Sequence, residues 1–217
     1  MEARKILALV ASPRKGGNTD TLTLSLLKSA NEKGAITEVV YLVDKKIKPC
    51  NQCEYCHQDI SNKCPILDDF NMIVEKMINA DIIVFATPIW WSSMHSLLKL
   101  LLDRCYSLVD KNWGNFKLQG KGFVIIACQT QADLNLYANP LVKEFEVYQD
   151  WLKFKVIGSL VASASEKGEV ASNEEIMDKA VKLGETLAQW KFLLLKTSME
   201  IETSFASGDL YNEFNSV

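Results

Sequence analysis

Four of the six cysteines in this chain lie in one short stretch. Cys50, Cys53 and Cys56 follow one another at three-residue steps, and Cys64 follows after a longer gap. Four thiolates can hold a zinc ion in a tetrahedron, and compact Cys-x2-Cys-x2-Cys spacing suits the corners of a [4Fe–4S] cluster. Free or redox-active thiols without a metal are a third possibility. Because zinc sites usually combine two cysteine pairs from separated turns, three thiols in one run favour the cluster over zinc.

A second candidate site is the sequence SPRKGGNT, Ser12–Thr19, which joins an apolar segment to the start of an expected helix. Free backbone N–H groups, the positive end of a helix dipole and short hydroxyl side chains together suit a phosphate group. Gly17 and the glycine before it let the backbone approach a ligand closely, and Arg14 adds a charged, forked donor. The spacing matches neither G-x-G-x-x-G nor GxxxxGK[ST]. A polar turn with Asn18 or Thr19 as helix N-cap is the alternative interpretation.

The third candidate site is the sequence TPIWWSSM, Thr87–Met94, which also follows an apolar run. Its two tryptophans could offer a flat apolar surface to a planar ring, and the backbone around Pro88–Trp91 could bond the polar edge of that ring. Tryptophans buried in the core or in a subunit interface are the alternative. Ser92 and Ser93 are expected to cap a helix, and His95 is expected one turn inside it, so no catalytic side chain is expected here.

Other residues with reactive side chains are expected to be structural. Asp103, Arg104 and Cys105 lie in an expected leucine-rich helix, and Cys128 ends an apolar strand. His57 lies within the cysteine-rich stretch and is expected to be solvated rather than a metal ligand.

Apolar runs alternate with amphipathic segments along most of the chain, which predicts a parallel α/β sheet with helices on both faces. Ligands in such sheets bind beyond the carboxyl ends of the strands, here after residues 11, 43, 87 and 128. The expected strands are Lys5–Ala11, Ile36–Val43, Asp81–Thr87, Gly122–Cys128 and Phe154–Ala162. One helix is expected to end at Gly34, a second to be capped by Asp68 or Asp69, and a third to run from about Ser93 to about Val109. The helical stretch after Cys128 is expected to be interrupted at Pro140, and a last helix, capped by Ser172 or Asn173, to run to about Lys196.

Length and composition predict one soluble domain. The chain has 217 residues, 48% hydrophobic and 24% charged, with a net charge of −3 and an isoelectric point near 5.5. This balance disfavours a nucleic-acid partner. The apolar run after Lys5 is too short for a membrane span or an export signal. A cytoplasmic, reducing compartment is therefore expected, which disfavours structural disulfides. We expect a domain over residues 1–196 with a cysteine-rich insertion at 46–68, and a polar tail at 197–217.

Three motifs occur in an order that resembles the flavodoxin-fold NADPH-dependent FMN reductases, and among them the iron–sulfur flavoproteins. They are SPRKGGNT, then C-x2-C-x2-C…C…DD, then TPIWW…K…DR. The resemblance implies a flavodoxin-like, five-stranded sheet and FMN as cofactor. It implies that the FMN phosphate lies near Ser12, Arg14, Asn18 and Thr19. It implies that the flavin ring lies near Pro88, Ile89, Trp90 and Trp91.

The resemblance also favours a [4Fe–4S] cluster at the four clustered cysteines. The leading hypothesis is an FMN-dependent redox flavoprotein that passes electrons from a donor to an acceptor through this cluster. An NAD(P)H-dependent quinone or FMN reductase without a metal, and a non-catalytic electron carrier, are the alternatives. Small-molecule or protein redox partners and a homodimer or homotetramer are expected.

Overall fold

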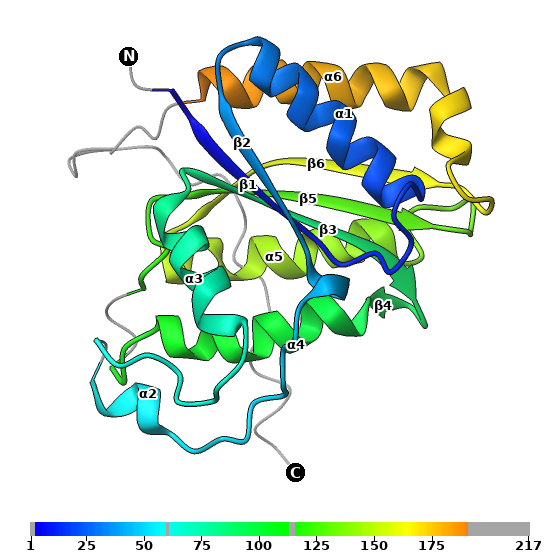
Figure 1. The fold of residues 1–217 in the computed structure, drawn as a ribbon. Coiled ribbons are helices and arrows are strands. Elements are labelled where there is room, and N and C mark those ends of the chain that lie inside the picture. The colour runs from blue at the N-terminus through cyan, green and yellow to red at the C-terminus, as the bar shows by residue number, and fades with distance from the viewer. Residues whose placement is uncertain (1–2, 60, 113–115, 191–217) are drawn as a thin grey trace, which may run out of the picture.

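The computed structural model describes residues 3–59, 61–112 and 116–190 as a twisted sheet covered by helices on both faces (Figure 1). The strands are β1 (Lys5–Val10), β2 (Ile36–Tyr41), β3 (Ile82–Trp90), β4 (Ser93–Met94), β5 (Gly122–Gln129) and β6 (Lys155–Ser163). The helices are α1 (Asn18–Glu32), α2 (Tyr55–Gln58), α3 (Phe70–Asn79), α4 (Ser96–Arg104), α5 (Ala138–Leu152) and α6 (Glu174–Gln189). Short 3-10 turns cover Leu42–Asp44, Cys105–Leu108 and Glu169–Ser172.

The sheet has the strand order β2-β1-β3-β5-β6, and these five strands are mutually parallel. This order is the flavodoxin-like arrangement, and it confirms the predicted fold class. The strand order reverses between β1 and β3, so the loops after these two strands diverge at the carboxyl edge of the sheet. Such a switch point is where doubly wound sheets bind their ligands.

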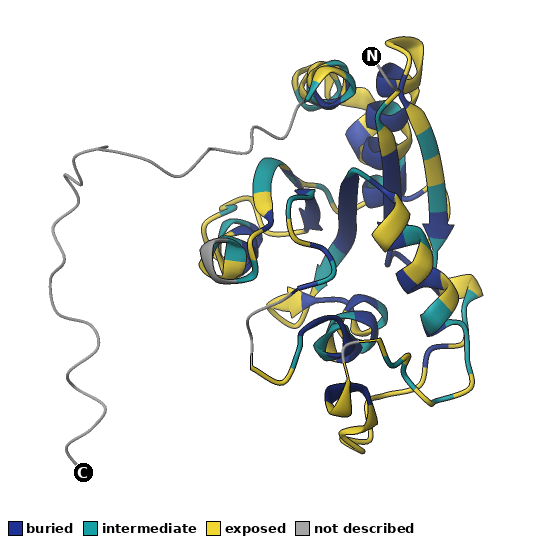
Figure 2. Ribbon diagram, turned by 90° about the vertical axis from the view of Figure 1, so that its left-hand side faces the viewer, coloured by how far each residue is buried: buried dark blue, intermediate teal, exposed yellow. Residues whose placement is uncertain are grey.

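Two apolar layers hold the sheet between its helices. Helices α1 and α6 cover one face, and α3, α4 and α5 cover the other (Figure 1). The central strands are almost entirely buried, as Figure 2 shows in dark blue, which explains their continuous apolar sequence. No helix in the described ranges has the length and apolar character that crossing a membrane requires.

The segment after the third strand differs from its prediction. Strand β3 continues to Trp90 and turns back into the short antiparallel strand β4, so the helix begins at Ser96 rather than Ser93. The N-cap is His95, whose Nδ1 accepts a hydrogen bond from the Leu97 N–H at 3.2 Å. The prediction that Ser92 or Ser93 caps this helix is therefore wrong. Ser93 pairs with Trp90 in the hairpin, so it is part of a strand and does not cap the helix.

Other helix boundaries are mostly as predicted. Gly34, with φ of +90°, follows the end of α1, and Asn173 caps α6 by accepting from the Ile176 N–H. Pro140 does not interrupt α5, because it lies in the first turn, where a missing N–H costs no intrahelical bond. The predicted end of the last helix at Lys196 and the tail 197–217 lie outside the described residues.

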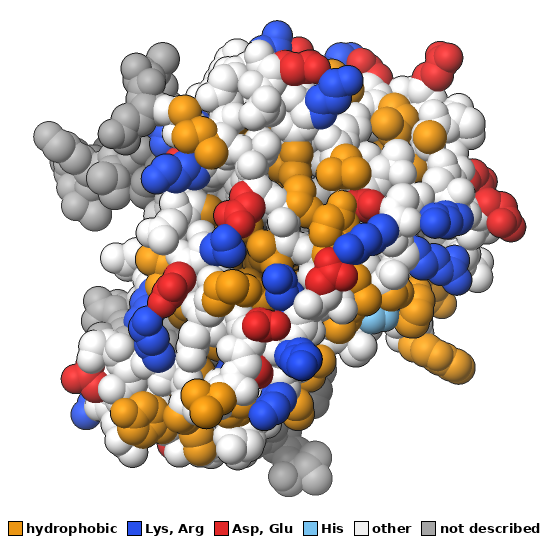
Figure 3. All heavy atoms as spheres, viewed as in Figure 1, with side chains coloured by type: hydrophobic (Ala, Val, Ile, Leu, Met, Phe, Trp, Pro, Cys, Tyr) orange, Lys and Arg blue, Asp and Glu red, His pale blue; other side chains and the backbone are white. Residues whose placement is uncertain are grey.

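Charged side chains of both signs are interspersed on the face that Figure 3 shows. Hydrophobic side chains gather at the lower edge of this face, around the cysteine-rich loop and α2. Leu67, which follows the last of the clustered cysteines, is 90% exposed. The cysteine-rich region therefore presents apolar side chains to its surroundings.

Candidate functional site

The loop between β1 and α1 is held in shape by its own hydrogen bonds. The Ser12 hydroxyl accepts from the Arg14 N–H at 3.2 Å, and the Gly17 N–H donates to the Arg14 carbonyl at 3.0 Å. Asp20 accepts from the Gly16 N–H at 2.6 Å and from the Tyr41 hydroxyl at 2.9 Å. These hydrogen bonds hold the loop in one conformation before any ligand binds.

The amino end of α1 has no side-chain cap. Its N-cap is Gly17, in an extended conformation, so neither Asn18 nor Thr19 is the N-cap, contrary to the alternative interpretation. A Cβ atom at Gly17 would lie 2.9 Å from the Arg14 carbonyl oxygen, which explains a residue without a side chain at this point. Uncapped N–H groups at a helix amino terminus form an anion site.

Two cations lie near this terminus. Arg14 is exposed and pairs with no carboxylate among the described residues. Lys167 approaches from the loop after β6, because a Cβ atom at Gly16 would lie 3.7 Å from its Cε. Asn18 ties the two loops together: its Nδ2 donates to the Glu166 carbonyl at 2.8 Å, and its Oδ1 accepts from the Val170 N–H at 3.2 Å.

The hairpin of β3 and β4 forms the second wall of the site. Its two turn residues, Trp91 and Ser92, have φ of +48° and +64°. Positive φ at both positions is the requirement of a type I′ turn, which Asn-Gly satisfies without strain and Trp-Ser does not. The Trp90 ring packs edge-on against the His95 ring with centroids 4.4 Å apart. Trp91 is completely exposed at the tip.

One cavity of about 460 Å³ joins these two loops at the carboxyl edge of the sheet. This volume is typical of a small-molecule or cofactor site. The structure therefore brings together all nine residues that sequence analysis assigned to FMN, and they line this cavity: Ser12, Arg14, Gly17, Asn18, Thr19, Pro88, Ile89, Trp90 and Trp91.

The loops after β5 and β6 complete the lining. Gln129 and Thr130 line the cavity, but the Gln129 side chain is occupied with the backbone of its own loop, including the Ala138 N–H at 2.8 Å. Residues 164–167 also line it, and sequence analysis missed them. The rule that ligands bind after the strands would have found them if it had been applied to the fifth predicted strand as well.

The four clustered cysteines line a separate small pocket of about 20 Å³, together with Arg104 and Tyr106. Cys50 and Cys53 are exposed, while Cys56 is buried. Burial raises the pKa of the Cys56 thiol, and the nearby Cys64 sulfur raises it further. The Gln52 N–H donates to the Cys50 sulfur at 3.4 Å.

The residues around this pocket suit a metal–sulfur group by their chemistry. All four cysteines line one pocket, and the Arg104 Nε is buried without a hydrogen-bond partner in the described part of the chain. However, no three His, Cys, Asp or Glu side chains within the described ranges are already arranged to hold a metal ion. A space this size accommodates about one water molecule, so the thiols would have to separate to bind a cluster.

His57 is not solvated, contrary to its sequence interpretation. It is buried and stacks on the Tyr106 ring with centroids 3.6 Å apart. Its Nε2 lies 2.9 Å from the Tyr106 carbonyl oxygen. The residue therefore packs the cysteine-rich loop onto the turn after α4.

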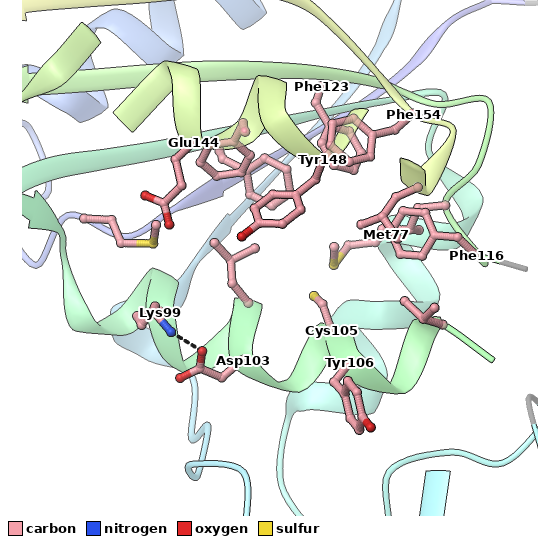
Figure 4. Close-up of a pocket in the computed structure, with 17 residues that line it drawn as sticks. Met77, Lys99, Asp103, Cys105, Tyr106, Phe116, Phe123, Glu144, Tyr148 and Phe154 are labelled. Carbon is pink, nitrogen blue, oxygen red and sulfur yellow. Dashed lines mark hydrogen bonds and ion pairs between the residues drawn. The ribbon is translucent and has the colours of Figure 1, made fainter. Parts of the chain in front are cut away.

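A third cavity, of about 330 Å³, lies between α4 and α5 beneath the sheet (Figure 4). Aromatic and aliphatic side chains line it, and the ion pair of Lys99 with Asp103 lies beside it. Cys105 points into this cavity, and burial raises the pKa of its thiol to about 12. With no uncapped helix terminus among its lining, this cavity lacks the features that suit the phosphate of FMN.

Comparison with known proteins identifies the family. Residues 4–169, from β1 to the turn after β6, match the family described as NADPH-dependent FMN reductase. The chain belongs to this family. The matched residues of this FMN reductase family member include all four loops that line the cavity and the whole cysteine-rich segment.

Individual relatives differ in how much of the chain they match. An iron–sulfur flavoprotein of Methanocaldococcus jannaschii is 38% identical over 100 residues, which are 46% of this chain and 51% of that protein. The chain thus spans about half the length of that relative. A putative NAD(P)H-dependent FMN-containing oxidoreductase of Bacillus subtilis is 26% identical over 183 residues, 82% of this chain and 96% of the relative.

The fold also matches solved structures. The NAD(P)H:quinone oxidoreductase from Methanothermobacter marburgensis superposes with a TM-score of 0.67 at 16% identity, covering 86% of this chain and 98% of that one. At this level of identity the likeness shows a shared fold.

Proposed function

We propose that this protein is an FMN-dependent oxidoreductase. The observation that carries the proposal is the single cavity at the switch point, which gathers all nine predicted residues over an uncapped helix terminus. Family membership supports the same cofactor. In this proposal the phosphate binds the loop Ser12–Thr19, and the planar ring lies against the β3–β4 hairpin.

The residues of the chain bind and orient the cofactor rather than take part in bond making. Arg14 and the α1 terminus supply charge and N–H donors to the phosphate. Trp90 supplies an apolar surface, and the backbone near Ile89 can bond the polar edge of the ring. When bound, FMN supplies hydride and single-electron chemistry.

We further propose that Cys50, Cys53, Cys56 and Cys64 hold a [4Fe–4S] cluster that relays single electrons to or from the flavin. Support comes from the four cysteines around one pocket, from the buried Arg104 Nε that has no hydrogen-bond partner in the described ranges, and from the relatives that bear the name iron–sulfur flavoprotein. The physiological donor and acceptor would be small-molecule or protein redox partners.

The second candidate is an NAD(P)H-dependent quinone or FMN reductase in which the cysteines bind no metal. The observation that favours it is the closed cysteine pocket, which has about 20 Å³ of space and no metal geometry within the described ranges. In this case the flavin alone would transfer electrons. Steady-state oxidation of NADH or NADPH with quinone acceptors separates either enzyme from a non-catalytic electron carrier.

The deciding experiment is anaerobic purification of the full chain followed by its visible spectrum, cofactor chromatography, and iron and acid-labile sulfide assays. We expect one FMN per chain and a cluster held by the four cysteines. The variant Cys53→Ser should stay yellow and folded but lose most of its iron, because the flavin contacts come from other loops. Cys105→Ala, outside the loop, should keep both cofactors.

Several outcomes would contradict the proposal. FAD, or no flavin, would overturn the cofactor assignment. A wild-type protein without iron and sulfide after anaerobic reconstitution would leave the second candidate. Full iron content in Cys53→Ser would remove these cysteines from the metal site, and zinc in place of iron would make the loop a structural element.

A further inference from the structure

Arg104 is the largest fully buried side chain in the described part of the protein, with 1% of its surface exposed. It is the last residue of α4 and lies over the Phe70 ring, with its Cζ 4.1 Å from the ring centroid. Burying a guanidinium is costly unless its charge and its donors are matched. The contacts of Arg104 therefore indicate the role of this buried charge.

Those contacts fasten both ends of the cysteine-rich loop to α4. Nη1 of Arg104 donates to Asp68 Oδ2 at 2.5 Å and to the Lys48 carbonyl at 3.2 Å. Nη2 donates to the Cys64 sulfur at 3.2 Å. Lys48 precedes the first clustered cysteine, and Asp68 follows the last, so one side chain spans the base of the loop.

The ion pair alone does not account for the whole arrangement. Asp68 neutralises the charge, and both side chains of the pair are completely buried. The pKa of Asp68 lies below its usual range, because hydrogen bonds from Arg104 and two backbone N–H groups outweigh the effect of burial. Beyond this pair, Arg104 donates from Nη2 to the Cys64 sulfur, has no partner for Nε among the described residues, and lines the pocket of the four cysteines.

We propose that Arg104 is a positioning residue for the cysteine centre: it holds Cys64 in place as a ligand and raises the reduction potential of the bound cluster. The inference rests on the cluster part of the proposed function. Reduction adds one negative charge to a cluster, so an N–H donor at a ligand sulfur stabilises the reduced form more than the oxidised form. Burial limits solvent screening of this interaction.

Two variants test this role without leaving a lone buried charge. The double variant Asp68→Leu/Arg104→Met replaces the ion pair by apolar side chains. Arg104→Lys keeps a positive charge beside Asp68 but loses the fork that reaches aspartate and sulfur together. Lys99→Met is the matched control, because it removes an exposed cation from the same helix. Circular dichroism, FMN, iron and sulfide content, and the cluster potential from an anaerobic titration followed by electron paramagnetic resonance are measured on each full-length protein.

We expect the double variant to fold and to keep FMN. Its cluster should be lost, or its equilibrium constant for one-electron reduction should fall at least tenfold, a downward shift of about 59 mV or more for a one-electron couple. Arg104→Lys should shift the potential in the same direction. Lys99→Met should match the wild type in iron content and potential.

The outcomes separate this inference from the function on which it rests. If both Arg104 variants keep wild-type iron content and potential, Arg104 is only an internal ion-pair residue and the inference is overturned, while the cluster assignment stands. If the wild type takes up no iron and sulfide, the cluster assignment fails and the inference fails with it. If the double variant does not fold, the potential and iron content of Arg104→Lys decide.

Discussion

Within the loop Ser12–Thr19, Arg14 has a charge that is available to a ligand. It lines the cavity and pairs with no carboxylate in the described ranges, whereas its neighbour Lys15 pairs with Asp44 at 2.6 Å. Arg14→Ala should weaken FMN binding by about 1.5–3 kcal/mol, because a charged hydrogen bond to the phosphate is lost. Fluorescence titration of the apoprotein with FMN measures this change.

Lys15→Ala is the control for that prediction. It removes a positive charge from the same loop, but its partner is a carboxylate and it does not line the cavity. Its FMN dissociation constant should stay close to that of the wild type. An unchanged constant in Arg14→Ala would remove Arg14 from the proposed phosphate site.

The turn of the β3–β4 hairpin has a type I′ conformation that its two residues, Trp91 and Ser92, do not favour. Positive φ costs about 1–2 kcal/mol for a residue with a side chain, and the turn places Trp91 and Ser92 there. Such strain is retained where a side chain has a role. Replacing the pair by Asn-Gly should keep the hairpin and raise the melting temperature of the apoprotein, because this pair favours a type I′ turn.

The same variant should bind FMN more weakly, since Trp91 lines the cavity. Higher stability together with weaker FMN binding would show that Trp91 contacts the ligand and that its strained backbone lowers the stability of the apoprotein. Wild-type affinity together with higher stability would show instead that the indole does not contact the flavin.

Helix α4 connects the two candidate sites. The hydrogen bond that its N-cap residue, His95, accepts depends on pH. His95 packs against Trp90 at one end, and Arg104 contacts Cys64 at the other, roughly 13 Å away by helix rise. Burial lowers the pKa of His95, and its Nδ1 must be unprotonated to accept from Leu97. The unfolded chain binds the proton more readily, so the contribution of His95 to stability is present above pH of about 6.5 and is lost as pH falls through its lower folded value.

Denaturant unfolding at pH 7.5 and at pH 5 tests this effect. The wild type should lose stability between these values by more than His95→Asn does, because asparagine caps a helix without titrating. Equal losses in the two proteins would mean that His95 does not contribute to the pH dependence.

At the scale of the whole molecule, exposed apolar side chains predict association. Trp91, in the β3–β4 hairpin, and Leu67, in the cysteine-rich loop, are almost fully exposed. We propose a homodimer or homotetramer whose interface includes one of these two loops, because such side chains beside a cofactor are covered by a partner. Sedimentation velocity at micromolar concentration should show an oligomer, and a monomer would contradict the proposal.

Surface variants locate that interface. Trp91→Asn or Leu67→Asn should shift the equilibrium towards the monomer. Val147→Asn removes an exposed apolar side chain from α5, outside both loops. This variant should sediment like the wild type, and a similar shift in it would place the interface on α5 instead.

The sequence by itself determined the features that arise locally. Continuous apolar runs predict buried parallel strands, and the loop Ser12–Thr19 contains the glycines, hydroxyls and charge of an anion site. The sheet and the position of the candidate site after β1 and β3 were therefore predictable. Only the tertiary structure decided the extension of β3 into a hairpin, the part of residues 164–167 in the cavity, and the contact of Arg104 with Cys64. These features depend on contacts between separate segments of the chain. The local periodicity of apolar residues shows which face of an element is buried, but not which segment packs against it.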